Sequence, residues 1–453
     1  MQTRVFKACL AAAIVMVFSS SLQISAQNGK PLSLDDAENL AVKNNHLVKV
    51  RRLQIDEKQQ KVNEDRIKYL PTIVAGGAYQ YNTGLPSITI DKGVFGELPL
   101  GTTKIPFPPI DEVLQMGNHD NYNAGISVYQ PVTQMGKINA GVQVSKSEYR
   151  IAQTEESKAE FQVRQTVEKL YFGLLILQKQ IEEANLKVTL AKTKLSDVEN
   201  AFSAGKTTES NKFGLSAAEA DEEQNLLKLQ IQYDDYASEL KQLIGLDETS
   251  ELVLQPVPSG QIIESAAVID TALNVASINN DDLRLASLYK TKADNAVRAS
   301  KYSFLPDVGL LGGYAYQKGT ALYPKNNAFV GASIKWNIQD VLSNRTIELQ
   351  RISAREQAEE NMANTKEQVS NDIAKTYRKL KQSEDLIKVA EKVVSYRRED
   401  LKMQSDKSSS GLNLEADLLT SKAALARAES DYFSAQLNYR ITLSELKILM
   451  GIY

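Results

Sequence analysis

Hydrophobic residues along most of the chain recur at alternating steps of three and four positions, the spacing of a coiled-coil helix. The longest run begins at Val163 and ends at Phe202. It predicts a helix from about Gln134 to Ala204, which would be about 105 Å long at 1.5 Å per residue. A strict heptad seam of this length predicts that the helix packs lengthwise against other helices. The seam residues are Val163, Val167, Leu170, Leu174, Leu177, Ile181, Ala184, Val188, Ala191, Leu195, Val198 and Phe202.

Four short segments interrupt this pattern with an apolar residue at every second position, the period of a β-strand. In the segment GASIKWNI, from Gly331 to Ile338, Ile334 and Trp336 point to one side and Ser333 and Lys335 to the other. An apolar face that ends in aromatic residues, opposite a polar face, is typical of a membrane barrel. An antiparallel sheet on a soluble core is the alternative interpretation. The residues predicted to face lipid are Tyr79, Ile126, Val128, Tyr314, Ile334 and Trp336.

This order of helices and strands occurs twice. From Asn123 to Gly245 the chain matches itself at an offset of 206 residues, which aligns Gly205 with Gly411. The preceding block, Ala37 to Tyr81, matches at an offset of 235 residues. Self-similarity at fixed offsets indicates a duplicated structural unit. The offsets differ by 29 residues, so the first copy carries about 29 extra residues between its two strands.

The pattern predicts the same order of elements in each copy: a helix, a strand, a loop, a strand, a long helix, a tight turn and a returning helix. The first helix is expected from about Leu34 to Leu70, where Pro71 stops it. The loop of the first copy is rich in Gly and Pro, and we expect it outside the cell as a plug or lid. The expected divisions are a first repeat at 27–245 (strands at about 72–82 and 122–132, loop 83–121, coil tip near 205), a linker at 246–263, and a second repeat at 264–453 (strands at about 307–317 and 327–338, coil tip near 411).

The N-terminal residues have the pattern of a secretory signal peptide, which we place at 1–26. Arg4 and Lys7 precede an apolar run from Ala8 to Phe18, and small residues follow up to Ala26. This run is too short for a bilayer, which takes about 20 residues, and no longer apolar stretch follows it. Removing Arg4 and Lys7 takes the formal charge from −3 to −5, which does not favour nucleic-acid binding.

Candidate chemistry is sparse. Cys9, the only cysteine, would leave with the signal peptide, and His46 and His119 are the only histidines. The sequence therefore predicts no disulfide, no metal site and no cofactor. Asp and Glu residues are spread along helix faces, and no phosphate-binding loop or nucleophile motif occurs. We therefore predict no catalytic residue and no enzyme activity.

Four strands are too few to enclose a lumen. Outer-membrane barrels begin at about eight strands, and unpaired strand edges cannot face lipid. The chain must therefore combine its strands with those of further copies. The predicted fold class is mainly α with a membrane β-barrel, built from a duplicated helix-strand-strand-helix-helix unit.

The chain resembles the TolC-like outer-membrane efflux protein family over essentially its whole mature length. The resemblance rests on the repeated helix, LP and strand, on the turn glycines in AFSAGKTTES and KSSSGLNLEADLL, and on the closing LIG and LMG. It implies a homotrimer with a 12-stranded β-barrel in outer-membrane lipid and a periplasmic α-helical barrel about 100 Å long. It also implies a passive exit duct, driven by an inner-membrane transporter through a periplasmic adaptor. The sequence does not specify the exported substrate.

The resemblance also implies site residues. The family narrows its periplasmic entrance with aspartates after the second tip glycine; Asp417, six positions past Gly411, matches, whereas Thr420 stands where a second aspartate is common. A tyrosine and an arginine of one branch are replaced by Ser408 and Asn413, so the closing network must differ from that branch. The tip residues implied to contact the adaptor are Gly205, Lys206, Ser410, Gly411 and Leu412.

A periplasmic coiled-coil scaffold or adaptor without a pore is the alternative function. It explains the heptads but not the two pairs of strands with lipid-type faces.

Overall fold

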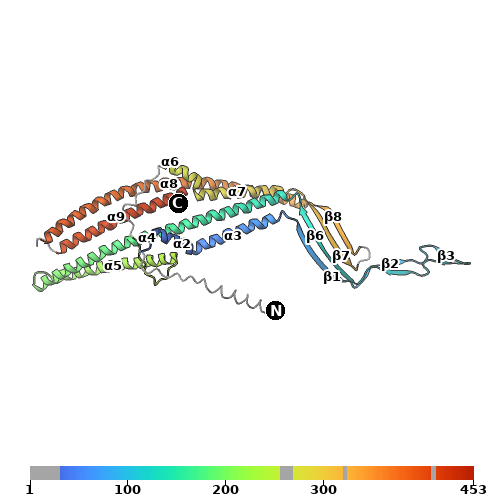
Figure 1. Cartoon of the computed structure of the whole chain (residues 1–453), viewed down its shortest axis with the longest axis horizontal. Helices are drawn as coiled ribbons and strands as arrows, with labels where there is room; N and C mark the ends of the chain where they lie inside the picture. Colours follow the sequence, from blue (N-terminus) through green and yellow to red (C-terminus); the bar gives the residue numbers. More distant parts are fainter. Residues whose placement is uncertain (1–30, 256–268, 320–323, 410–414, 453) are drawn as a thin grey trace, which may run out of the picture. The chain divides into compact units, whose positions relative to one another are not determined.

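The computed structural model describes residues 31–255, 269–319, 324–409 and 415–452, which form two compact units (Figure 1). The strand unit comprises residues 52–155 and 281–368. The helical unit comprises the described residues of 1–51, 156–280 and 369–453. The predicted signal peptide, the tip around Gly411 and residues 256–263 of the predicted linker lie outside the described residues.

The strand unit contains a four-stranded antiparallel sheet in the order β1-β6-β7-β8. Its strands are β1 (Thr72–Tyr81), β6 (Asp120–Pro131), β7 (Asp307–Lys318) and β8 (Asn326–Lys335). The fourth strand ends three residues before the expected position 338. Asn337 stops it there, because its side-chain oxygen accepts a hydrogen bond from the Gln339 backbone at 3.2 Å and so caps the next helix. Trp336 therefore lies just beyond the strand, contrary to the prediction that it belongs to it.

The expected loop between β1 and β6 has secondary structure of its own. It contains β2 (Ser87–Ile90), β3 (Glu97–Leu100), β4 (Thr103–Pro106) and β5 (Glu112–Gln115). β2 pairs with β5, and β3 pairs with β4, so the segment forms two successive two-stranded ribbons. We call residues 87–115 the arm; Figure 1 shows it beyond the end of the sheet. Its Gly and Pro content predicted turns but not these short pairings.

Helices complete the strand unit. They are α7 (Asp281–Tyr302), most of α3 (His46–Ile67) and parts of the two long helices α4 (Met135–Ser203) and α8 (Ile338–Ser409). Ion pairs connect α7 to its neighbours, with Lys292 2.7 Å from Glu148 of α4 and Lys290 2.8 Å from Glu359 of α8.

The helical unit is built from the remaining parts of α4 and α8 with α5 (Glu209–Ile244), α9 (Glu415–Met450), α2 (Leu34–Asn44) and α6 (Ile269–Asn279). The predicted heptad seam of α4 is buried at most positions from Val163 to Val188 and becomes more exposed towards Phe202. The largest buried side chains include Tyr171, Phe172 and Leu437, which share one core cluster. The predicted mainly helical fold with long coiled helices and β-strands is confirmed. Among the described residues, no helix has the length and apolarity required to cross a membrane.

The first helix of each repeat is broken, contrary to the continuous helix expected from Leu34 to Leu70. The break in the first repeat lies at Asn45, whose backbone is extended and whose side chain accepts a hydrogen bond from the Leu47 backbone at 2.8 Å. Asn45 thus caps α3, a role that asparagine fills well. In the second repeat, Asn280 lies between α6 and α7.

Both breaks lie against the end of a returning helix. The Asn44 side chain donates a hydrogen bond to the Ile244 carbonyl at 2.6 Å, and that of Asn280 to the Leu449 carbonyl at 2.8 Å. The glycine that follows each returning helix has a positive φ, 75° at Gly245 and 68° at Gly451. A Cβ on Gly245 would also lie only 2.7 Å from Asn44, so glycine is required there for both reasons.

Candidate functional site: the strand face and the coil tips

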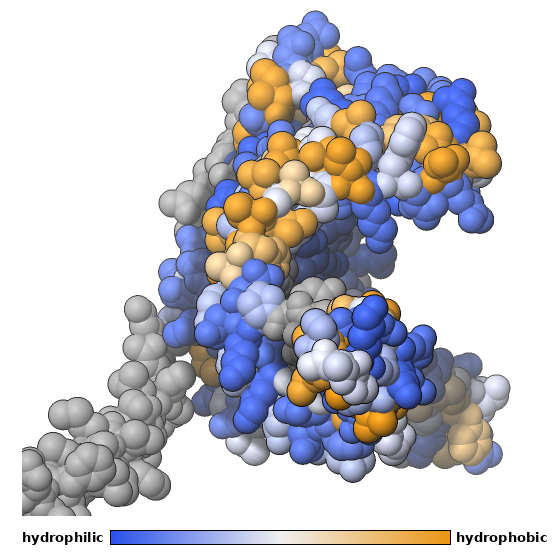
Figure 2. All heavy atoms as spheres, turned by 90° about the vertical axis from the view of Figure 1, so that its right-hand side faces the viewer, coloured by the Kyte–Doolittle hydropathy of each residue, from blue (hydrophilic) through white to orange (hydrophobic). Residues whose placement is uncertain are grey.

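The strand register places five of the six residues predicted to face lipid, all but Trp336, on one side of the sheet. Tyr79 lies opposite Tyr122, and Ile126 lies opposite both Ala75 and Tyr314. Ile334 pairs with Val308 on the same face. Ile126, Tyr79, Tyr314 and Ile334 are all more than half exposed. Figure 2, which turns the right-hand side of Figure 1 towards the viewer, shows clusters of hydrophobic residues among hydrophilic ones on the surface.

The opposite face of the sheet carries mainly small and polar residues, with Val74, Leu311 and Phe329 as apolar exceptions. Ser127 lies opposite Gly313, and Ser333 lies opposite Gly309. The Tyr129 hydroxyl of this face donates a hydrogen bond to Asp307 at 2.9 Å. A Cβ on Gly309 would lie 2.4 Å from the Tyr129 ring, so this glycine makes room for the tyrosine. Such a face suits contact with water.

The two edges of the sheet are β1 and β8. Each of these strands has one neighbour in the sheet that the described residues form. Each presents a row of backbone N–H and C=O groups along its other side. Since an apolar medium offers these groups no partner, a lipid-exposed sheet must pair both edges.

The tip of the first coil is a tight glycine turn between α4 and α5. Gly205 has a φ of 72°, and its N–H donates to the Phe202 carbonyl at 2.9 Å. The Lys206 N–H donates to the Ala201 carbonyl at 2.8 Å, which completes a Schellman end of α4. The structure therefore places Gly205 and Lys206 in the predicted turn. The corresponding residues Ser410, Gly411 and Leu412 lie outside the described residues.

The predicted entrance residues lie at the start of α9. Asp417 is exposed in the first turn of this helix, where a carboxylate interacts favourably with the helix dipole. Thr420 is also exposed, and its hydroxyl donates a hydrogen bond to the Ala416 carbonyl of its own helix at 2.7 Å. The predicted ring would consist of Asp417 from each copy of the chain, so a single chain contributes only one of its carboxylates.

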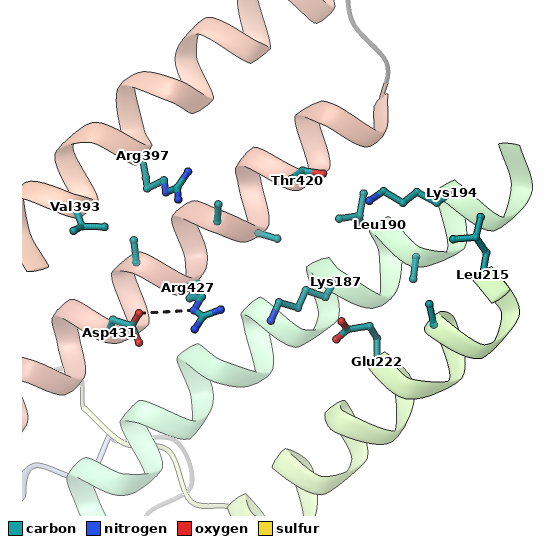
Figure 3. A pocket seen from close by; sticks show the side chains of 15 residues that line it. Lys187, Leu190, Lys194, Leu215, Glu222, Val393, Arg397, Thr420, Arg427 and Asp431 are labelled. Atoms are coloured by element: carbon teal, nitrogen blue, oxygen red, sulfur yellow. Dashed lines mark ion pairs between the residues drawn. The ribbon is translucent and has the colours of Figure 1, made fainter. Parts of the chain in front are cut away.

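Thr420 also lines a cavity of about 590 Å³ in the helical unit. Its walls come from α4, α5, α8 and α9, and Figure 3 shows Lys187, Glu222 and Arg427 pointing into it. Arg427 lies 3.9 Å from Asp431 of the same helix, so part of the charge in the cavity is paired locally. The sequence did not indicate this cavity, because its four walls are distant segments of the chain.

A buried ionic cluster lies between α2, α4 and α9 of the helical unit. Glu168 of α4 is 6% exposed, and its carboxylate lies 3.8 Å from the guanidinium of Arg440 on α9. Burial raises the pKa of Glu168 to about 7, against the lowering effect of a hydrogen bond with Ser444. Glu38 of α2 raises it further, and pairs with Arg164 of α4 at 3.3 Å. The sequence analysis did not identify this cluster. The only indication in the sequence is that a charged residue, Glu168, directly follows the seam residue Val167.

The sequence profile of the family described as outer membrane efflux protein matches residues 38–246 and 272–452, which is most of the chain. The chain belongs to this family. It is accordingly an outer-membrane efflux channel rather than an enzyme, with a helical part in the periplasm, as the resemblance predicted. Family membership decides against the scaffold without a pore. Among curated protein sequences, none matches the chain.

Solved outer-membrane proteins share this fold at low sequence identity. The protein VceC of Vibrio cholerae superimposes with a TM-score of 0.69 at 15% identity, over 92% of this chain and 96% of that one. The CmeC outer membrane channel of Campylobacter jejuni gives 0.73 at 14% identity, over 92% and 85%. The open state of the MtrE outer membrane channel of Neisseria gonorrhoeae gives 0.69 at 16% identity, over 92% and 89%.

Proposed function

We propose that three copies of the chain close one 12-stranded β-barrel in the outer membrane. The observation that carries this proposal is the sheet of four alternating antiparallel strands, with an apolar face and with β1 and β8 at its edges. Because the strand directions alternate, β8 of one copy runs antiparallel to β1 of the next. The ring therefore closes with the same pairing throughout, and every edge is satisfied.

A second, independent surface supports assembly. An apolar heptad stripe on α8 is exposed in the single chain, with Leu386 at 55%, Val389 at 57% and Tyr396 at 73% exposure. Val393 and Met403 continue the same stripe at helical spacing. A coiled-coil seam of this kind requires a partner helix, which a neighbouring copy would supply.

The assembled protein would act as the passive exit duct of a tripartite efflux or secretion system. An inner-membrane transporter would supply energy and select the cargo, and a periplasmic adaptor would join it to the duct. The adaptor would contact the coil tips around Gly205, Lys206, Ser410, Gly411 and Leu412. Asp417, with Thr420 one turn later, would line the narrow periplasmic entrance.

Paired cysteines at the two sheet edges test the barrel. Cys9 is the only natural cysteine and lies in the predicted signal peptide, so the mature chain would offer no competing thiol. One cysteine replaces Ala75 on β1, and a second is moved along the same face of β8 through Ala328, Val330, Ala332 and Ile334. Mild oxidation of membranes should link copies at one register and give a ladder that ends at a covalent trimer.

The matched controls place the second cysteine on the other face of β8, at Phe329 or Gly331. These variants should link poorly, because neighbouring residues of a strand point to opposite sides. A ladder that ends at the dimer would contradict the trimer. Absence of any link at all four positions, with protein present in the outer membrane, would contradict edge pairing itself.

A further inference from the structure

The arm exposes an unusual amount of apolar surface. Every large aliphatic or aromatic side chain between Ser87 and Gln115 except Ile90 is at least 40% exposed. Phe95 reaches 68% and Ile110 reaches 67%. A concentration of apolar side chains on so short a segment marks a surface that another molecule covers.

The ribbon of β3 and β4 is amphipathic. In β3 and β4, Leu98 lies opposite Ile105, and Leu100 shares their face. The other face carries Lys104 and Glu97, whose charged groups lie 3.8 Å apart. In the ribbon of β2 and β5, Ile88 lies opposite Leu114, but Glu112 lies opposite Ile90 on the same face and Val113 lies on the other face. This ribbon therefore carries apolar side chains on both faces.

A free two-stranded ribbon is marginally stable in water, so these ribbons need a cover for their apolar faces. The two strands of each ribbon also have unpaired outer edges within the described residues, which adds backbone groups that another chain could satisfy.

The base of the arm is held firmly to the sheet. The Asn82 N–H donates to the His119 carbonyl at 2.8 Å, and the His119 ring nitrogen Nδ1 lies 2.7 Å from the Asn82 carbonyl. The His119 ring also stacks on Tyr81 with centroids 5.7 Å apart. The Asn118 N–H donates to the Gly319 carbonyl at the end of β7, at 2.8 Å. The arm therefore leaves the sheet from a defined joint.

We infer that the arms of neighbouring copies pack on one another through these apolar faces and together cover the outer mouth of the barrel. This inference rests on the proposed oligomer, since a closed ring brings one arm per copy to the same end of the barrel. Tethering of this kind gives a high effective concentration of arms, so weak apolar contacts suffice. The charged face of the β3–β4 ribbon, with Glu97 and Lys104, would then point outward to water.

The charges of the arm favour a second copy over a lipid surface as the cover. Elements that lie on membranes are typically rich in Lys and Arg on their polar face. The arm has only Lys92 and Lys104, against the four carboxylates Asp91, Glu97, Asp111 and Glu112. Its apolar faces are therefore better suited to pack on an identical ribbon.

A single cysteine on each face of the outer ribbon tests this inference. Leu98→Cys on the apolar face should form a reducible dimer when whole cells are treated with a short thiol cross-linker. Lys104→Cys on the charged face of the same ribbon is the matched control and should give little dimer. Both positions are exposed, so neither change threatens the fold.

Protease added to whole cells gives a second readout. The double variant Phe95→Ser, Phe107→Ser removes two exposed rings and should increase trypsin cleavage of the arm roughly tenfold or more, because packed segments resist proteolysis.

Absence of the Leu98→Cys dimer while the Ala75 edge link still forms would overturn the inference and leave the channel intact. Absence of both the Leu98→Cys dimer and the Ala75 edge link would instead overturn the proposal that the chain forms an oligomer. Labelling of Leu98→Cys by a lipid-phase probe would show that the membrane covers the arm, and would also overturn it.

Discussion

At the scale of single residues, Glu168 is the group whose chemistry the fold changes most. Its carboxylate is buried beside Arg440, and burial raises its pKa from 4.5 to about 7. A raised pKa means that the folded protein binds a proton more tightly than the unfolded chain. The stabilisation that this proton brings is complete below about pH 4.5 and is lost as pH rises through about 7. The shift corresponds to about 3 kcal/mol at most.

We therefore predict that Glu168→Gln changes how stability depends on pH. The variant cannot ionise, so its melting temperature relative to the natural protein should rise between pH 5 and pH 9. Thermal unfolding of the detergent-extracted protein measures this difference. Glu445→Gln is the matched control: Glu445 is 3.4 Å from Lys169 in the same region but one third exposed, so water solvates its charge. Parallel curves for natural protein and Glu168→Gln at all pH values would refute the prediction.

The contrast between Gly205 and Glu168 explains which residues sequence could identify. A glycine between two heptad runs predicts a tight turn from the local sequence alone, because such a turn needs a residue with a positive φ. The structure has that turn at Gly205. The pKa of Glu168 is raised first by burial and further by Glu38, whereas Ser444 and Arg440 lower it, and all three of these residues belong to helices far away along the chain. No local pattern could show those partners.

At the scale of elements, hydrophobic periodicity predicted the long helices but not the positions at which an asparagine ends or caps a helix or strand. The expected helix from Gln134 to Ala204 is α4, Met135–Ser203. Asn45 and Asn280 lie at the breaks of the first helices, and Asn45 caps α3. Asn337 likewise ends the fourth strand early. Capping depends on one side-chain hydrogen bond, which hydrophobic spacing does not register.

A prediction at this scale concerns the lipid face of β8. Ile334→Asp places a charge on the face proposed to contact lipid and should cost about 2 kcal/mol or less of insertion free energy. Lys335→Asp is the matched control, one residue later on the opposite face. Heat-modifiable oligomer in the outer-membrane fraction should fall for the first variant only. An equal fall for both would point to a general strand defect, and no fall for Ile334→Asp would mean that this face does not contact lipid.

At the scale of the whole molecule, the structure of one chain shows which of its surfaces lack a partner more clearly than it shows how many copies assemble. The edges β1 and β8, the exposed stripe on α8 and the arm each lack a cover within the described residues. Strand count and edge chemistry already required further copies on sequence grounds. The number three came from family resemblance, because no residue pattern within one chain distinguishes two copies from three.

The periplasmic entrance is where assembly would create chemistry that no single chain has. Asp417 lies in the first turn of α9, and its counterpart in the first repeat is Asn211, whose amide donates to Thr207 at 3.0 Å. A trimer would therefore place three carboxylates and three neutral amides around the narrow end. Converging carboxylates attract cations, and low-dielectric walls strengthen their field.

We therefore predict that Asp417→Asn weakens cation selectivity and block by divalent ions in single-channel recordings. The stability of the trimer should change little, because an exposed charge contributes about 1 kcal/mol or less. Glu415→Gln removes one charge from the same helical turn and is the matched control, since Glu415 is not proposed to reach the axis. Equal loss of selectivity in both variants would indicate a general surface charge effect. Unchanged selectivity and block in Asp417→Asn would show that Asp417 is a solvated helix charge and that the channel narrows elsewhere along its tips.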